Sequence, residues 1–167
     1  APYKHQVVYL MDEKAVVSAL PDIKKELDRT KYNILPGTLK IYCPEIFTSF
    51  LMDDRDYLDI LESLDLHRNR EQIKSASEGA AQGGKSGEFF FFSADKKLII
   101  KTVPDSEMKM LASILGRLQG HFQSYPNSLI AKVYGAITFE NTDEKLRFNL
   151  IIMKNVCGVP SKFVERV

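Results

Sequence analysis

One stretch of the sequence, from Gly83 to Val103, constrains the fold more than any other. It opens with three glycines, continues into an aromatic block at Phe89–Ser93 and ends in an aliphatic run at Leu98–Val103. Both runs have the length and composition of strands, and the tetrapeptide that separates them suits a turn. The stretch therefore predicts a β-hairpin with the glycines at its open end.

The glycine-rich segment before the hairpin predicts an anion-binding loop. A main chain without Cβ atoms can bring its N–H groups close to an anion such as a phosphate. The candidate phosphate-binding residues are Gly83, Gly84, Lys85, Ser86 and Gly87. Glycine-rich turns also precede strands that bind no ligand, and a lysine at a loop tip is often simply solvated, so both interpretations stay open on this segment alone.

Lys101 is a charged residue inside the aliphatic run. It must lie on a solvated face or against an anionic partner, because an unpaired buried charge is costly. Glu107 is in the first turn of a helix that follows Pro104, close enough for an ion pair with Lys101. A glycine loop, a strand lysine and a helix glutamate are the nucleotide-binding arrangement of the protein-kinase fold. A lysine on an edge strand can equally be a solvated residue that protects the edge.

Four segments, in order along the chain, resemble the phosphatidylinositol phosphate kinase family. They are Tyr42–Phe47, the central stretch with Gly84–Gly87, Phe89–Phe92 and Leu98–Val103, then Asn127–Gly135 and Leu150–Val156. The resemblance covers about residues 36–167, and ordered similarity over separated segments is more specific than one loop. It implies a fold like the nucleotide-binding lobe of kinases, of the phosphatidylinositol phosphate kinase/SAICAR synthase-like type.

The resemblance also implies an ATP site and a role for each of its residues. Lys101 would bind the α- and β-phosphates of ATP, the glycine loop would cover them, and Glu107 would hold Lys101. Met153, Lys154, Asn155 and Val156 resemble the hinge whose main-chain groups bind the adenine edge. In the complete enzyme, Mg²⁺ ions bridge the phosphates while a phosphatidylinositol monophosphate is converted to phosphatidylinositol 4,5-bisphosphate.

In this family the catalytic and metal-binding aspartates follow the hinge in a larger lobe. None of the 167 residues is therefore expected to be catalytic or a metal ligand, and the chain alone is expected to show little kinase activity. The loop that selects a 4-phosphate or a 5-phosphate substrate lies in the same lobe, so the sequence leaves that choice open.

Composition excludes several classes of function. The net charge of +1 gives no broad electrostatic case for binding nucleic acid. No apolar run approaches the length of a membrane helix, and two distant cysteines suit reduced cytosolic thiols. The three histidines lack metal-ligand spacing.

The resemblance implies a cytoplasmic protein, peripheral at the cytoplasmic face of membranes, whose partners are a phosphatidylinositol monophosphate and the anionic membrane surface.

The predicted elements give an α+β fold in which helices pack on an antiparallel sheet. Helices are predicted over residues 5–30, from Pro44, after an Asp54 cap, and from Asp105 to the region of Gly120 and Pro126; residues 67–88 are predicted as loop. Further strands are predicted at Leu129–Tyr134, Ala136–Phe139 and Leu146–Met153. We expect two parts: a mostly helical extension over residues 1–74, which could form a homodimer, and a nucleotide-binding lobe over residues 75–167.

Two other functions remain as alternatives. A non-catalytic scaffold could keep the same lobe for dimerisation or partner binding. A protein-serine/threonine kinase lobe is disfavoured, because the loop Gly84–Gly87 is shorter than the protein-kinase glycine pattern and Tyr42–Pro44 has no counterpart there.

Overall fold

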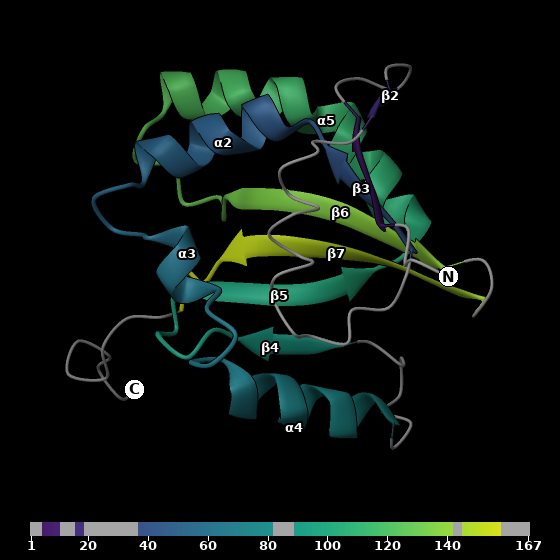
Figure 1. The fold of residues 1–167 in the computed structure, drawn as a ribbon. Coiled ribbons are helices and arrows are strands. Elements are labelled where there is room, and N and C mark those ends of the chain that lie inside the picture. Colours follow the sequence, from purple (N-terminus) through teal and green to yellow (C-terminus); the bar gives the residue numbers. More distant parts are fainter. Residues whose placement is uncertain (1–4, 11–15, 19–36, 82–88, 142–144, 158–167) are drawn as a thin grey trace.

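The computed structural model describes residues 5–10, 16–18, 37–81, 89–141 and 145–157. Its centre is a seven-stranded sheet of order β2-β1-β3-β6-β7-β5-β4 (Figure 1). The strands are β1 His5–Leu10, β2 Val16–Ser18, β3 Gly37–Tyr42, β4 Phe90–Phe92, β5 Leu98–Val103, β6 Val133–Asn141 and β7 Leu146–Lys154. The helices are α2 Pro44–Asp53, α3 Ile60–Ser63, α4 Arg70–Ala81 and α5 Asp105–Ser124.

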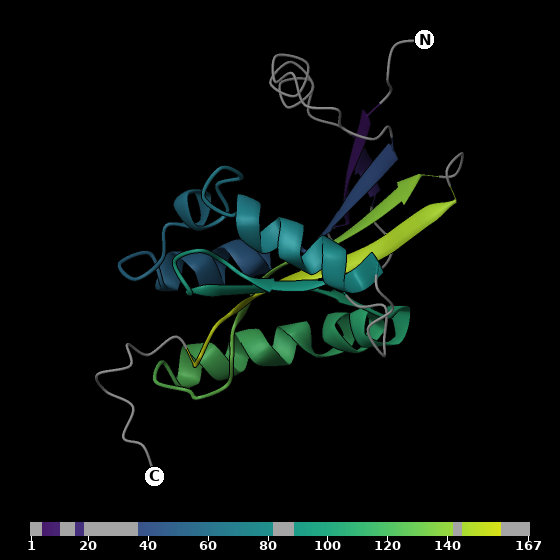
Figure 2. The ribbon, with the colours of Figure 1, turned by 90° about the horizontal axis from the view of Figure 1, so that it is seen from below.

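Neighbouring strands of this sheet are antiparallel, except that β1 runs parallel to β3. Helices α4 and α5 lie on opposite sides of it (Figure 2). The predicted α+β fold class is confirmed. No helix among the described residues combines the length and the apolar character needed to cross a membrane.

The predicted hairpin is confirmed as β4 and β5. Phe90 pairs with Lys101, and the main-chain N–H of Ser93 donates to Leu98 O over 3.0 Å. In the turn, Lys96 has a φ of 62°, and the carboxylate of Asp95 accepts the N–H of Lys97 at 3.1 Å. The hairpin is therefore closed by local hydrogen bonds as well as by strand pairing.

The core lies between the sheet and helices α2 and α5. The apolar residues of α5 recur at helical spacing, and its buried members are Met108, Leu115 and Phe122. The ring of Phe50 on α2 meets that of Phe122 edge to face at 5.2 Å, which fixes the two helices side by side (Figure 1). Pro44 is in the first turn of α2, as predicted. The N–H that proline lacks would have no intrahelical acceptor at this position, so no hydrogen bond of the helix is lost.

The helix predicted over residues 5–30 is wrong for the parts that the structure describes. His5–Leu10 and Val16–Ser18 are strands, and β1 extends the sheet next to β3. The segment Val7–Tyr9 is rich in β-branched and aromatic residues, which suit a pleated surface. The rest of that prediction, over residues 11–15 and 19–30, lies outside the described residues. The division into 1–74 and 75–167 stays a prediction, although β1 and β3 join the sheet of the second part.

The loop predicted over residues 67–88 is wrong where helix α4 forms. Although the composition of α4 is polar, one narrow stripe of the helix is half-buried; its residues are Gln72, Ile73 and Ala76. Such a stripe is enough to attach a helix whose other faces are solvated. The remaining part of the predicted loop, residues 82–88, lies outside the described residues.

Two smaller predictions also change. The short helix α3 is capped by Asp59, whose carboxylate accepts the N–H groups of Leu61 and Glu62, and not by Asp54. The two strands predicted around Gly135 are one strand, β6, which begins at Val133 and has an irregular register at Val133/Gly135. A bulge of this kind interrupts the pattern without ending the strand.

Candidate functional site

Lys101 is part of a row of residues that crosses four strands. Its neighbours in register are Phe90 on one side and Ile151 on the other, and Ile151 pairs with Ala136. Residues opposite each other share a face of the sheet. Along this row the exposed fraction rises from 2% at Ala136 through 9% at Ile151 to 46% at Phe90, with Lys101 half-buried. Lys101 therefore lies where this face passes from the core to solvent.

Apolar side chains surround Lys101 on the same face. By strand alternation, Ile99 lies one step along β5, with Phe92 and Met153 opposite it on the two neighbouring strands. All three are partly buried. The rings of Phe90 and Phe92 are 5.1 Å apart. We call Phe90, Phe92, Ile99, Lys101 and Met153 the lysine face.

The ion pair predicted between Lys101 and Glu107 is absent, although the structure describes both residues. The first turn of α5 is held instead by Asp105, whose carboxylate accepts from Asn149 Nδ2 at 2.8 Å and from Arg147 at 2.6 Å. Glu107 follows two residues later, about 200° around the helix, and is exposed. Asp105 thus ties the first turn of α5 to β7, while Glu107 is exposed and forms no ion pair with Lys101.

The five predicted loop residues, Gly83, Gly84, Lys85, Ser86 and Gly87, lie outside the described residues. The chain enters the described region at Phe89, whose main-chain O accepts the N–H of Thr102 at 2.9 Å and whose N–H donates to Thr102 Oγ1 at 3.0 Å. Phe89, the first described residue after that segment, therefore lies one residue from the level of Lys101 in the hairpin.

The predicted hinge residues follow directly from β7. Met153 lies on the lysine face, and the N–H of Lys154 donates to Lys132 O at 2.8 Å. Asn155 is 6% exposed and ties this chain to the β4–β5 turn: its N–H donates to Lys97 O at 2.9 Å and its Nδ2 to Lys96 O at 2.8 Å.

The side chain of Asn155 is thus a structural anchor of the hinge. Its Oδ1 also accepts the N–H of Cys157 at 3.1 Å. Val156 between them is 52% exposed, and no described residue accepts a hydrogen bond from its N–H. Of the four predicted hinge residues, Val156 is exposed, Met153 and Lys154 are partly buried, and Asn155 is buried.

Sequence analysis missed the role of Asp54. Its carboxylate accepts from Lys132 Nζ at 3.1 Å and from the hydroxyl of Tyr134. Burial raises the pKa of the Tyr134 hydroxyl, and the hydrogen bond to Asp54 raises it further. The Lys132 ammonium also lies 5.4 Å from the centre of the Phe122 ring. These contacts join the end of α2 to the start of β6, 78 or more residues apart in the chain. Local sequence patterns could therefore not predict them.

Tyr57 lies between two lysines near the hinge. Lys97 Nζ donates to Tyr57 O at 2.9 Å and lies 5.3 Å from the centre of its ring, and Lys154 Nζ is 5.1 Å from the same ring. Burial, and then the charges of Asp95 and Asp54, raise the pKa of the Tyr57 hydroxyl. Lys154, the lysine of the predicted hinge, thus makes a cation–π contact with Tyr57.

Asp95 organises the β4–β5 turn under this hinge. It accepts from Ser63 Oγ at 2.5 Å and from Ser93 Oγ at 2.6 Å. Burial alone would raise the pKa of Asp95, but the hydrogen bonds from Ser63, Ser93 and the Lys97 N–H outweigh it and hold this pKa below its ordinary value. The turn is therefore most stable when Asp95 is ionised.

Replacing Asp95 with asparagine should make the chain less stable near neutral pH but not in acid. Because the folded-state pKa is lowered, the carboxylate contributes stability above its unfolded pKa of about 4 and loses this contribution as the pH falls through the lower folded value. Urea unfolding of both proteins, followed by circular dichroism between about pH 7 and pH 3, should show midpoints that differ at the upper end and converge at the lower end. A constant difference across this range would assign no role to the ionised carboxylate.

Comparison with known proteins gives one family. Residues 70–166 match the model of the family described as phosphatidylinositol-4-phosphate 5-kinase. A protein of Dictyostelium discoideum named as a probable phosphatidylinositol phosphate kinase is 35% identical over 132 residues, which are 76% of this chain and 17% of that protein.

Two further relatives are named phosphatidylinositol 4-phosphate 5-kinases. Phosphatidylinositol 4-phosphate 5-kinase 9 of Arabidopsis thaliana is 32% identical over 122 residues, which are 70% of this chain and 14% of that protein. The its3 protein of Schizosaccharomyces pombe is 39% identical over 100 residues, covering 58% of this chain and 12% of that protein. The chain thus spans between 12% and 17% of the length of these three relatives.

Proposed function

This chain belongs to the phosphatidylinositol-4-phosphate 5-kinase family, and we propose that it supplies the ATP-binding part of a lipid kinase. The observation that carries the proposal is the lysine face, where one cationic side chain lies among apolar side chains at the accessible end of a sheet face. An apolar site with a few placed polar groups suits a ligand that has both a ring and charged groups.

The proposed contacts follow from the strand register. Ile99, Met153 and Phe92 offer an apolar surface to the adenine ring, and Lys101, two residues along β5 from Ile99, offers its ammonium to the phosphates. Two residues of a strand span about 6.6 Å, so one ligand can contact both. The glycine-rich segment precedes Phe89, which is bonded to Thr102 next to Lys101, and we propose that it covers the phosphates with its N–H groups.

For the adenine edge we propose the main chain of Val156. Asn155 already uses its own N–H, Nδ2 and Oδ1 within the protein, and the N–H of Lys154 is bonded to Lys132 O. Asn155 is therefore proposed as a positioning residue that fixes the direction of the hinge. Glu107 is proposed to join Lys101 only if the side chains rearrange when a nucleotide binds.

The proposed reaction of the whole protein is transfer of the ATP γ-phosphate to a phosphatidylinositol monophosphate, which gives phosphatidylinositol 4,5-bisphosphate at the cytoplasmic surface of a membrane. Mg²⁺ accompanies the ATP phosphates in such reactions and neutralises their charge. The described residues hold no group of three or more His, Cys, Asp or Glu side chains suited to a metal ion. We propose that these 167 residues alone bind ATP without transferring its phosphate.

The natural full-length protein tests this function directly. With Mg²⁺ and γ-labelled ATP, it should transfer labelled phosphate to vesicles that contain phosphatidylinositol 4-phosphate or phosphatidylinositol 5-phosphate, and the isolated 167 residues should not. Transfer to neither lipid by a folded full-length protein that binds ATP would favour the non-catalytic scaffold. Comparing the two lipids at equal concentration identifies the preferred substrate.

A further inference from the structure

Three lysines converge on one short turn beside the predicted hinge. Lys97 precedes β5, Lys132 precedes β6 and Lys154 is the last residue of β7, so all three lie at the same end of three neighbouring strands. The turn of residues 54–57 follows α2 and passes this end of the sheet (Figure 1). We call it the 54–57 turn. Its residues contact the side chains of all three lysines.

Asp54 holds Lys132 from the first position of this turn. Lys132 Nζ donates to the Asp54 carboxylate over 3.1 Å, and the two side chains are only 12% and 15% exposed. Because separating such a pair would leave a charge buried without its partner, the contact fixes Lys132 to the turn. The main-chain O of Lys132 in turn accepts the N–H of Lys154 at 2.8 Å. Asp54 therefore supports the first part of the hinge through Lys132.

Tyr57 holds the other two lysines. The centre of its ring lies 5.3 Å from Lys97 Nζ and 5.1 Å from Lys154 Nζ, and its main-chain O accepts a hydrogen bond from Lys97 Nζ at 2.9 Å. Each ammonium is attracted by the negative π-system of the ring. The main-chain O of Lys97 accepts the N–H of Asn155 at 2.9 Å. Tyr57 thus contacts Lys154 directly and reaches Asn155 through Lys97.

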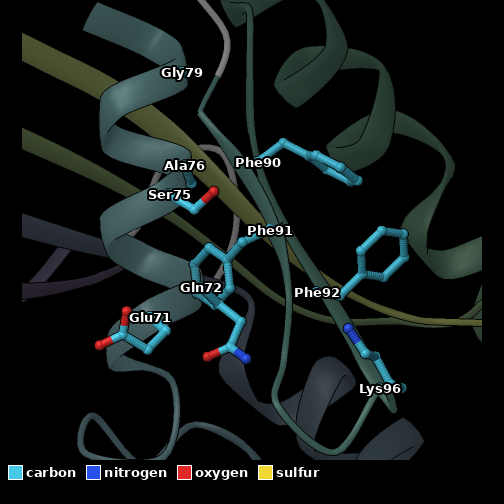
Figure 3. A pocket seen from close by; sticks show the side chains of 9 residues that line it. All are labelled: Glu71, Gln72, Ser75, Ala76, Gly79, Phe90, Phe91, Phe92 and Lys96. Carbon is cyan, nitrogen blue, oxygen red and sulfur yellow. The ribbon is translucent and has the colours of Figure 1, made fainter.

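The β4–β5 turn that bonds Asn155 is held on its other side by Lys96. Figure 3 shows the Lys96 side chain directed toward Phe92, and its Nζ lies 5.8 Å from the centre of that ring. The main-chain O of Lys96 accepts Asn155 Nδ2 at 2.8 Å. Phe92 is part of the lysine face, so one turn joins the support of the hinge to the apolar surface proposed for adenine.

The core holds the 54–57 turn in place. The main-chain O of Asp54 accepts the N–H groups of Tyr57 and Leu58, both at 2.9 Å, which closes the turn. Leu58, directly after it, is 3% exposed, and Phe50, in the last part of α2, is 2% exposed. Closely packed residues on both sides leave the turn little room to move. It can therefore serve as a fixed support for the strand ends beside it.

We propose that the 54–57 turn positions the hinge, and that Tyr57 is a positioning residue for the adenine part of the nucleotide. This inference rests on the proposed ATP site. The N–H groups of Lys154 and Asn155 are bonded within the protein, and their direction sets that of the next N–H, on Val156, which is proposed to meet the adenine edge. Tyr57 acts on this group through Lys97 and Lys154, without contact with the nucleotide.

Adenosine and Mg·ATP separate this role from a contact with phosphate. In Tyr57→Ala the dissociation constants of both ligands should rise about threefold or more, because two cation–π contacts behind the hinge are lost. In Lys101→Ala only the constant of Mg·ATP should rise, since adenosine has no phosphate. Methyl NMR titrations that follow Met153 measure both ligands. An unchanged adenosine constant in Tyr57→Ala contradicts the proposal.

Tyr57→Phe is the matched control. It keeps the ring and the main-chain acceptor of Lys97 Nζ and removes only the hydroxyl group. Adenosine and Mg·ATP should bind to this variant as they bind to the wild type. Equal weakening by Tyr57→Phe and Tyr57→Ala would show that the ring and its two lysines do not position the nucleotide.

Amide hydrogen exchange tests the turn without any nucleotide. In Tyr57→Ala the N–H groups of Lys154 and Asn155 should exchange about threefold faster or more, whereas that of Ile151, further inside β7, should keep its rate. Unchanged rates at both hinge residues overturn the proposal. If these rates rise but the wild type binds neither adenosine nor ATP, the proposed nucleotide site is wrong and the role of Tyr57 is confined to supporting the hinge.

Discussion

Replacing Phe50 with alanine will lower the free energy of unfolding by about 3–5 kcal/mol. The Phe50 side chain is 2% exposed, and its ring packs edge to face on Phe47 at 6.4 Å and on Phe122 at 5.2 Å. Its loss removes apolar burial and leaves a cavity where α2 meets α5. Urea unfolding followed by circular dichroism measures the change.

Phe90→Ala is the matched control for this substitution, because the same atoms are deleted from a side chain that is 46% exposed. It should cost less than about 1 kcal/mol. If the two variants lose equal stability, the core is not centred on the contact between α2 and α5.

Replacing Lys101 with alanine will weaken ATP binding by about tenfold to a hundredfold. A charge-assisted contact to phosphate is worth roughly 1.5–3 kcal/mol, and each 1.4 kcal/mol corresponds to a factor of about ten in the dissociation constant. Titration calorimetry with Mg·ATP on the folded chain measures this change. Because Lys101 has no ion pair among the described residues, its removal should leave the free energy of unfolding nearly unchanged.

Lys109→Ala controls for the loss of one positive charge. Lys109 is exposed on α5, outside the lysine face, and its removal should leave ATP affinity within about twofold of the wild type. Equal weakening by both variants would mean that net charge, and not a contact made by Lys101, controls binding.

Local patterns in the sequence predict the elements next to the site. The aromatic and aliphatic runs around Ala94–Lys97 specify the β4–β5 hairpin, and the apolar spacing after Asp105 specifies α5. Pro44 marks the start of α2. In each case the signal lies within one turn or one strand, where dihedral preferences and side-chain periodicity act directly.

Contacts between distant segments were not predictable from those patterns. Residues 5–10 form a strand because β3 lies beside them, and α4 forms because its narrow stripe meets β4. Asp54 has the sequence context of a helix cap, yet its carboxylate binds Lys132 and Tyr134. Local propensity is overridden wherever the partner that satisfies a residue is supplied by the tertiary fold.

In the candidate site, too, the strands were predictable from local patterns and one tertiary contact was not. Residue order placed Lys101 on a strand after the glycine-rich segment, and the register of β4, β5 and β7 then placed Phe92, Ile99 and Met153 around it. The expected pair with Glu107 did not form, because Asp105 holds the first turn of α5 to β7. Spacing along the chain gave the correct elements but not the direction of a helical side chain.

The most direct test of the lysine face is a methyl NMR titration of the chain with Mg·ATP. Ile99 and Met153 lie on the same face as Lys101, whereas Ile100 and Ile152, the residues beside them, lie on the opposite face. We predict that the methyl signals of Ile99 and Met153 shift with one saturable dissociation constant, and that Lys101→Ala weakens this constant about tenfold or more. Larger shifts at Ile100 and Ile152, or no shift at Ile99 and Met153 while ATP binds, would contradict the assignment of this face as the nucleotide site.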